Sequence, residues 1–264
     1  MELRHMTVLY FSPSGTTEQT ARAIADASGL PCDMVDLLRQ RDYATHFAPD
    51  ELVLVCLPVF GGRLPAVCPA LLRQFTAEGS PAAGVVVYGN RAYEDAGVEL
   101  LDLLTAQGFR PCAAAAVVAQ HSIFPKVAAG RPAGTDLEQL ARFGRELHAR
   151  LASLPAGELP EIPDMPGNRP YREFSGVPMR PRTSSACIRC GACAAICPVG
   201  AIPAGEPTRT DKQKCISCTA CIHVCPAGAR SFGGLVYKAG SALFTKKCAL
   251  PRQPEFYLPA GRSE

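Results

Sequence analysis

The sequence predicts an α/β fold in two units: a doubly wound, five-stranded parallel sheet, followed by a small α+β domain built around cysteines. Short apolar runs alternate with helical patterns through the first 153 of 264 residues, which is typical of parallel sheets covered by helices. Eight of the thirteen cysteines then lie between positions 187 and 225. We therefore expect a first domain over residues 1–153, a proline-rich linker over 154–183, a cysteine-rich domain over 184–233, and a tail over 234–264 that packs back on a domain.

The apolar pattern places the elements of the first domain in order. Runs short enough for buried parallel strands occupy residues 6–11, 32–36, 51–57, 84–88 and 112–119. Helical periodicity occupies residues 18–27, 68–77, 94–107 and 135–154, and the first and third of these stop at Gly29 and Gly108. Ligands of such sheets bind beyond the carboxyl ends of the strands. The loops that follow the strands are therefore the expected place for a site.

The composition excludes several classes of protein. The formal net charge of +3 and the absence of a basic run argue against binding to nucleic acid or to a membrane surface. No apolar segment is long enough to span a bilayer, and the apolar stretch at the N-terminus is too short for a signal peptide. Five cysteines outside the cysteine-rich segment are scattered singly, mostly in apolar runs, and are interpreted as reduced core residues: Cys32, Cys56, Cys68, Cys112 and Cys248. We therefore expect a cytoplasmic protein without membrane insertion.

The cysteine-rich segment contains the spacing C-x2-C-x2-C-x3-C-P twice, and this is the bacterial pattern for ligands of [4Fe–4S] clusters. Three thiolates on one tight loop can hold three corners of a cubane, while the fourth points elsewhere. In two-cluster proteins the fourth cysteine of each run ligates the other cluster. One cluster is thus assigned to Cys187, Cys190, Cys193 and Cys225, and the second to Cys215, Cys218, Cys221 and Cys197.

Structural zinc is the alternative interpretation of these cysteines, because paired C-x2-C motifs also form all-cysteine zinc sites. Zinc requires four thiolates per ion, in two pairs. It gives no reason for the third cysteine of each run, for the fourth at x3 spacing, or for the proline after it. The pattern therefore favours two iron–sulfur clusters.

The loop after the first expected strand has the composition of a phosphate site. It holds four hydroxyl side chains and one glycine directly before a helix: Ser12, Ser14, Gly15, Thr16 and Thr17. A glycine allows the backbone to approach an anion, hydroxyls donate hydrogen bonds, and the helix N-terminus contributes free N–H groups. Serine and threonine are also ordinary helix caps. Four hydroxyls in six residues favour the phosphate site over a cap alone.

These motifs resemble those of flavodoxins, in which the loop after the first strand binds the phosphate of FMN. The stretch from Ser12 to Thr17 matches that motif in full. The segments around Phe60, Tyr93 and His121, together with the order of the two units, resemble the flavodoxin–ferredoxin fusion family, in which a flavodoxin-like domain precedes a two-cluster ferredoxin. The resemblance covers most of the chain.

The resemblance also implies which residues surround the flavin ring. Two further loops of flavodoxins flank the ring, and each usually carries an aromatic or apolar stacking residue; Phe60 and Tyr93 fall at these places. The residues assigned to the ring from these loops are Pro58, Val59, Phe60, Gly61, Gly89, Asn90, Arg91 and Tyr93. His121 either bonds the flavin or satisfies backbone groups at a strand end, and the family resemblance favours the flavin.

The function predicted from these features is electron transfer between two [4Fe–4S] clusters and FMN, and between redox partner proteins. FMN exchanges one or two electrons and each cluster exchanges one. The alternative is a flavin-dependent reductase acting on NAD(P)H or on a small acceptor, although the sequence has no G-x-G-x-x-G motif. A third possibility is a binding module that has lost FMN, against which the intact Ser12–Thr17 loop argues.

Overall fold

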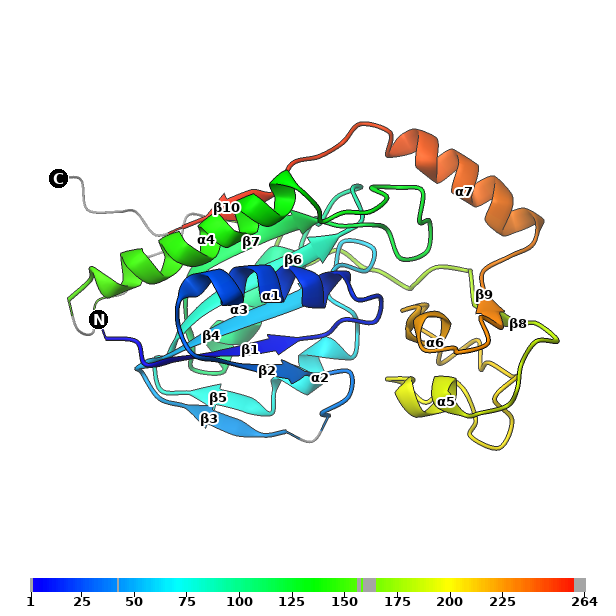
Figure 1. Cartoon of the computed structure of the whole chain (residues 1–264), viewed down its shortest axis with the longest axis horizontal. Coiled ribbons are helices and arrows are strands. Elements are labelled where there is room, and N and C mark those ends of the chain that lie inside the picture. The colour runs from blue at the N-terminus through cyan, green and yellow to red at the C-terminus, as the bar shows by residue number, and fades with distance from the viewer. Residues whose placement is uncertain (1, 42, 156–157, 159–164, 259–264) are drawn as a thin grey trace.

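The computed structural model describes residues 2–41, 43–155, 158 and 165–258, and its first half is built on a six-stranded sheet (Figure 1). The strand order is β10-β7-β6-β4-β1-β2. The parallel strands are β1 (His5–Tyr10), β2 (Cys32–Asp36), β4 (Glu51–Pro58), β6 (Pro81–Tyr88) and β7 (Arg110–Val118). Numbered along the chain, these five have the order 2-1-3-4-5, which is the order of flavodoxin-like doubly wound sheets. The predicted fold class is confirmed.

The sheet differs from the prediction by one additional strand. Residues of the C-terminal tail form β10 (Glu255–Tyr257), which pairs antiparallel with β7 at the edge of the sheet. The helix expected over residues 68–77 is also shorter. It ends as α2 (Cys68–Leu72), and the remainder becomes β5 (Phe75–Ala77), which pairs with β3 (Thr45–Phe47). Phe75 and Phe47 are both buried, with ring centroids 6.2 Å apart, and this packing favours the extended conformation over another helical turn.

Helices cover both faces of the sheet. Figure 1 shows α1 (Thr16–Ser28) and α4 (Thr135–Ala152) on one face and α3 (Ala96–Ala106) on the other. Ile24 and Phe143 bury the first face against strand residues such as Val8. Gly144 of α4 contacts α1 directly, because a Cβ atom there would lie 2.2 Å from the backbone oxygen of Ile24. Only glycine therefore permits this helix separation.

The cysteine-rich region forms a small unit beside the carboxyl ends of the sheet strands (Figure 1). Its elements are two short helices, α5 (Ala192–Ile196) and α6 (Ala220–His223), and a two-stranded antiparallel sheet of β8 (Arg182–Thr183) and β9 (Arg230–Ser231). Each short helix directly follows a residue in the left-handed region, Gly191 at φ 77° and Thr219 at φ 73°. These turns lie within the cysteine loops, so backbone direction changes sharply between cysteines.

The small unit packs against the first domain through apolar and polar contacts. Ile196, Cys218 and Ala220 belong to the same buried cluster as residues of the α3 face of the sheet. Arg41, which follows β2, donates hydrogen bonds to the backbone oxygens of Ile196 (2.9 Å) and Cys197 (3.2 Å). The carbonyl end of α5 is therefore satisfied by a side chain from the other unit.

The linker and the tail both return to the first domain. Met165 lies against Gly97 of α3, since a Cβ atom at Gly97 would lie 2.4 Å from its sulfur. After the small unit the chain forms α7 (Leu235–Lys247) and then β10, where Phe256 packs on Phe143. Within the linker and tail boundaries expected from the sequence, residues 156–157, 159–164 and 259–264 lie outside the described part of the chain. Among the described residues, no helix combines the length and apolar character needed to cross a membrane.

Candidate functional site

The loop between β1 and α1 has the geometry of an anion site. Gly15, which precedes α1, has φ 87°, a left-handed conformation that favours glycine. No hydrogen bond joins the backbone N–H groups of Ser14, Gly15, Thr16 or Thr17 to another residue in the part of the chain that is described. The hydroxyl oxygens of Ser14 and Thr16 lie 3.4 Å apart. Free N–H groups and hydroxyls at a helix N-terminus fit a phosphate.

The remaining hydroxyls of this loop have other places. The Ser12 hydroxyl oxygen accepts a hydrogen bond from the backbone N–H of Glu18 at 2.9 Å, so Ser12 satisfies the first turn of α1. Thr17 is buried, with 1% of its surface exposed. Ser14 and Thr16 line the adjacent cavity, whereas Ser12, Gly15 and Thr17 do not. The cap and the anion site thus coexist, on different hydroxyls of one loop.

A cavity of about 290 Å³ opens beside this loop. Its first wall comes from the carboxyl ends of the sheet strands, as the sequence predicted, and includes Pro58, Val59, Phe60, Gly61, Gly89, Arg91 and His121. Its second wall comes from segments far along the chain: Arg172, Phe174 and Val177 of the linker, Ile216, Ser217 and Cys218 of the small unit, and Phe244 of α7. The cavity therefore lies where all parts of the chain meet.

Two residues assigned to the flavin ring from sequence, Asn90 and Tyr93, do not line this cavity. The Asn90 side chain donates to the backbone oxygens of Cys248 (2.8 Å) and Leu250 (3.0 Å), and its oxygen accepts from Arg252 N–H (2.8 Å). The Tyr93 hydroxyl lies 2.6 Å from a carboxylate oxygen of Glu255 in β10. The tail takes both side chains, and their expected contacts with the ring are corrected accordingly.

Phe174 is the aromatic residue that the sequence interpretation missed. A Cβ atom at Gly61 would lie 2.1, 2.3 and 2.5 Å from three carbons of its ring, so the ring rests directly on the Gly61 backbone. Gly61 has φ 62°, and its missing side chain leaves room for this contact. The only sequence signal for Phe174 was an isolated aromatic residue in a proline-rich stretch.

His121 lies in the cavity wall as a neutral imidazole. Burial, together with the positive charge of Arg91, lowers its pKa to about 4. Its Nδ1 atom accepts hydrogen bonds from the backbone N–H groups of Ile123 (3.2 Å) and Phe124 (3.1 Å). The proton of the ring therefore resides on Nε2, which is left as a donor. Both alternatives from the sequence hold in part, since the ring satisfies backbone groups and also lines the cavity.

Arg91 brings little net charge to the cavity. Its guanidinium forms two hydrogen bonds with the Glu94 carboxylate, at 2.9 and 2.7 Å. The hydrogen bond from Arg91 is the largest cause of the lowered pKa of Glu94, and Arg172 of the linker adds to it. This wall of the cavity is thus an ion-paired surface.

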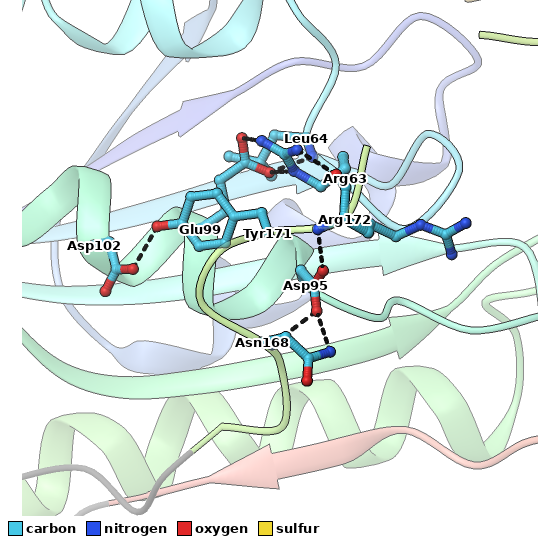
Figure 2. A network of polar contacts seen from close by, with 8 residues as sticks. All are labelled: Arg63, Leu64, Asp95, Glu99, Asp102, Asn168, Tyr171 and Arg172. Carbon is cyan, nitrogen blue, oxygen red and sulfur yellow. Dashed lines mark hydrogen bonds and ion pairs between the residues drawn. The ribbon is translucent and has the colours of Figure 1, made fainter. Parts of the chain in front are cut away.

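A network of polar contacts attaches the linker to the residues that follow β4 and β6 (Figure 2). One Asp95 carboxylate oxygen accepts from the backbone N–H (2.8 Å) and the amide (3.0 Å) of Asn168, and the other accepts from the backbone N–H of Arg172 at 2.6 Å. Burial acts to raise the pKa of Asp95, but these hydrogen bonds outweigh it and the pKa is lowered. Asp95 is 1% exposed, so the linker is held by a buried carboxylate two residues from Phe174.

Arg63 reinforces the same attachment. Its guanidinium forms a two-point ion pair with Glu99 at 2.8 and 2.9 Å and donates to the backbone oxygen of Arg172 at 2.6 Å. It also lies 4.9 Å from the ring centroid of Tyr171, a cation–π distance. The Tyr171 hydroxyl donates to Asp102 on α3. The linker therefore follows a defined path to the cavity.

The eight motif cysteines line two further cavities in the crossed sets that the spacing predicts. Cys187, Cys190, Cys193 and Cys225 line one, here called the distal cavity. Cys215, Cys218, Cys221 and Cys197 line the other, here called the proximal cavity because Cys218 also lines the cavity beside the phosphate loop. Among the described residues, no three His, Cys, Asp or Glu side chains are grouped for a single metal ion.

The donors around these cavities fit iron–sulfur clusters. Backbone N–H groups point at three of the sulfurs: Ala201 at Cys197 (3.2 Å), Ser217 at Cys215 (3.5 Å) and Ala229 at Cys225 (3.3 Å). Hydrogen bonds to cluster sulfurs are a normal part of such sites. Burial raises the pKa of the thiols of Cys218 and Cys221, to about 12 and about 11. Ionising them therefore requires positive charge, which the irons of a cluster supply.

Comparisons with known proteins agree with this division of the chain. Residues 186–229 match the family model described as a 4Fe-4S dicluster domain. A search of curated proteins gave no match. Solved structures similar to the first half include a flavodoxin from the domain Archaea, with 16% identity and a TM-score of 0.40 over 56% of this chain and 99% of that chain. A short-chain flavodoxin associated with a non-canonical PDU bacterial microcompartment has 15% identity and a TM-score of 0.39 over 57% and 100%. A flavodoxin variant from Pseudomonas aeruginosa has 21% identity and a TM-score of 0.34 over 53% and 96%.

The strand order, rather than these distant similarities, defines the first half as a flavodoxin-like α/β fold. The chain joins that fold to a 4Fe-4S dicluster segment. This combination is the one expected from the resemblance to flavodoxin–ferredoxin fusion proteins.

Proposed function

We propose that the chain is an electron-transfer iron–sulfur flavoprotein that binds FMN in the cavity beside the phosphate loop and two [4Fe–4S] clusters in the distal and proximal cavities. One observation carries the proposal: Ile216, Ser217 and Cys218 line both the FMN cavity and the proximal cavity. A single three-residue wall thus separates the two sites. In this proposal residues 1–153 form the FMN domain, 154–183 the linker, 184–233 the ferredoxin domain and 234–264 the returning tail.

The residues around the FMN cavity have distinct tasks. Ser14, Thr16 and the free N–H groups at the start of α1 bind the phosphate. Phe60 and Phe174 provide apolar surface for the flavin ring, and Phe244 of α7 limits access of water. His121 offers its Nε2–H as a hydrogen-bond donor that stays neutral at pH 7. FMN, when bound, supplies one- and two-electron chemistry, and each cluster supplies one-electron chemistry.

The distal cavity gives redox partner proteins a place to exchange electrons. Cys190 is exposed, and Ile188 between the first two cysteines of the motif is 67% exposed. The proximal cysteines Cys218 and Cys221 are buried. The exposed cysteine loop is thus the side of the ferredoxin domain that a partner can approach closely, while the buried one faces the flavin.

The test begins with anaerobic purification and analysis of iron, acid-labile sulfide and flavin. We expect about eight irons per chain, from two four-iron clusters, and one FMN. Flavin reduction by a one-electron protein donor is then compared in the wild type and in the Cys215→Ser/Cys218→Ser variant, which removes two proximal ligands. An equally fast flavin reduction in that variant would contradict the relay. Rapid NAD(P)H oxidation without a protein partner would favour the reductase instead.

A further inference from the structure

The two cysteine motifs are an internal repeat, and the residue five positions after each fourth cysteine differs between them. The first repeat reads Cys197-Pro-Val-Gly-Ala-Ile202 and the second reads Cys225-Pro-Ala-Gly-Ala-Arg230. Ile202 is 5% exposed and lines the proximal cavity, while Arg230 is 3% exposed and lines the distal cavity. Equivalent positions therefore hold a buried aliphatic side chain at one cluster site and a buried cation at the other.

Arg230 has only neutral partners among the described residues. Nη1 donates to the Thr210 hydroxyl (2.9 Å), and Nη2 donates to the backbone oxygens of Pro207 (2.5 Å) and Arg209 (3.3 Å). Its Nε atom is buried without a hydrogen-bond partner in this part of the structure. Of the ion pairs between described residues, none includes Arg230. Burying a cation without a counter-charge is costly. The charge of Arg230 thus requires an anion that the protein itself does not provide.

An iron–sulfur cluster in the distal cavity is such an anion. A [4Fe–4S] cluster with four thiolates carries about −2 in the oxidised state, and reduction adds one electron and hence one further negative charge. Arg230 already acts on the nearby thiols: burial raises the pKa of Cys221, and the charge of Arg230 opposes that rise. In the proximal cavity, the equivalent Ile202 offers no such charge.

We propose that Arg230 sets apart the reduction potentials of the two clusters, by stabilising the added electron on the distal one. This inference rests on the proposed function, since it requires both clusters. The distal cluster then has the higher potential of the pair, and the first electron taken up by the ferredoxin domain resides at the exposed loop around Cys190 rather than beside the FMN cavity. Arg230 is in this sense a positioning residue for the electron.

The test is an anaerobic redox titration with dithionite as reductant, followed by electron paramagnetic resonance of the two reduced clusters. In Arg230→Ile, which makes the second repeat match the first, we expect the higher potential to fall toward the lower one. The equilibrium constant for sharing an electron between the clusters should change at least about tenfold, which is about 59 mV for one electron. Arg230→Lys, which retains the charge, should keep most of the separation.

Controls separate this effect from loss of folding or of surface charge. Arg209→Ile removes the same charge from a side chain that is 68% exposed, and solvent and salt should screen it, so both potentials should stay near the wild-type values. Arg230→Gln removes the charge but keeps a polar side chain, should Arg230→Ile fail to assemble clusters. Unchanged potentials in a fully assembled Arg230→Gln protein, or an equal shift in Arg209→Ile, would overturn the inference. A wild type lacking two clusters would instead overturn the proposed function.

Discussion

Asp95 holds the linker against the first domain, and its replacement by asparagine gives a quantitative prediction. The carboxylate accepts three hydrogen bonds, two from Asn168 and one from the backbone N–H of Arg172. An asparagine has one acceptor oxygen, so its NH2 group must face a donor on one side. The least costly orientation loses the bond to Arg172. A hydrogen bond to a charged group contributes about 1.5–3 kcal/mol, so linker docking should weaken by roughly 2 kcal/mol.

That loss can be measured as opening of the linker. Because 1.4 kcal/mol corresponds to a factor of ten, 2 kcal/mol should raise the undocked population roughly 30-fold. Limited trypsin digestion at the Arg172–Glu173 bond reports this population when opening and closing are fast relative to cleavage. Weaker FMN binding, followed by flavin fluorescence, should accompany it, because Phe174 loses its position on Gly61.

The Asp102→Asn variant is the matched control for Asp95→Asn. Asp102 also contacts the linker, through Arg169 and Tyr171, but its side chain is 36% exposed and that of Arg169 is 58% exposed. Exposed ion pairs contribute about 0–1 kcal/mol. The control should therefore accelerate cleavage only severalfold. Wild-type cleavage rates in Asp95→Asn, or equal rates in the two variants, would refute the argument that the buried carboxylate holds the linker.

Three further predictions concern the site and the core. His121 has a folded-state pKa of about 4 against 6.5 unfolded, so the unfolded chain binds more protons between these values; stability is fully present above pH 6.5 and is lost as the pH falls toward 4. Between pH 7.5 and 5.5 this loss should be about 1.3 kcal/mol by denaturant unfolding, and an equal pH slope in His121→Gln would contradict it. Replacing Cys225 by alanine should empty the distal site, with iron analysis and electron paramagnetic resonance as the readout, and Cys197→Ala should empty the proximal site; survival of the proximal cluster set in Cys197→Ala would disprove the crossed assignment. Gly144→Ala should destabilise the first domain by about 1–3 kcal/mol, because its Cβ atom would meet the Ile24 backbone oxygen, and a thermal midpoint equal to that of wild type would show that the helices can separate at no cost.

The sequence was sufficient for the elements whose signal is local. Buried parallel strands are continuous apolar runs, and the five predicted ones are all present. The cysteine spacing was sufficient to predict the crossed sets, which the structure brings together around two cavities. Both signals are short-range, because they depend on residue types within about ten positions of each other.

Elements that depend on distant partners could not be predicted. Nothing in the local pattern of residues 255–257 distinguishes a strand from a loop, since β10 exists only through its pairing with β7. Asn90 and Tyr93 stand at the expected distance after β6, yet the tail captures both side chains. Phe174 and Arg230 went unnoticed for a related reason. The first acquires meaning from Gly61, and the second from comparison with Ile202 across the repeat.

The path of the chain through the ferredoxin domain has a mechanical consequence. That domain is not a terminal appendage, because the chain enters it from a segment docked on α3 and leaves it through α7 toward a strand in the sheet (Figure 1). A domain tied at one end sweeps a large volume, whereas one tied at both ends has already lost that freedom during folding. The separation between the proximal cysteines and the flavin cavity is thus a fixed property of the fold. A partner protein meets a rigid body, and changes in electron-transfer rate must come from energetics rather than from swinging of a domain.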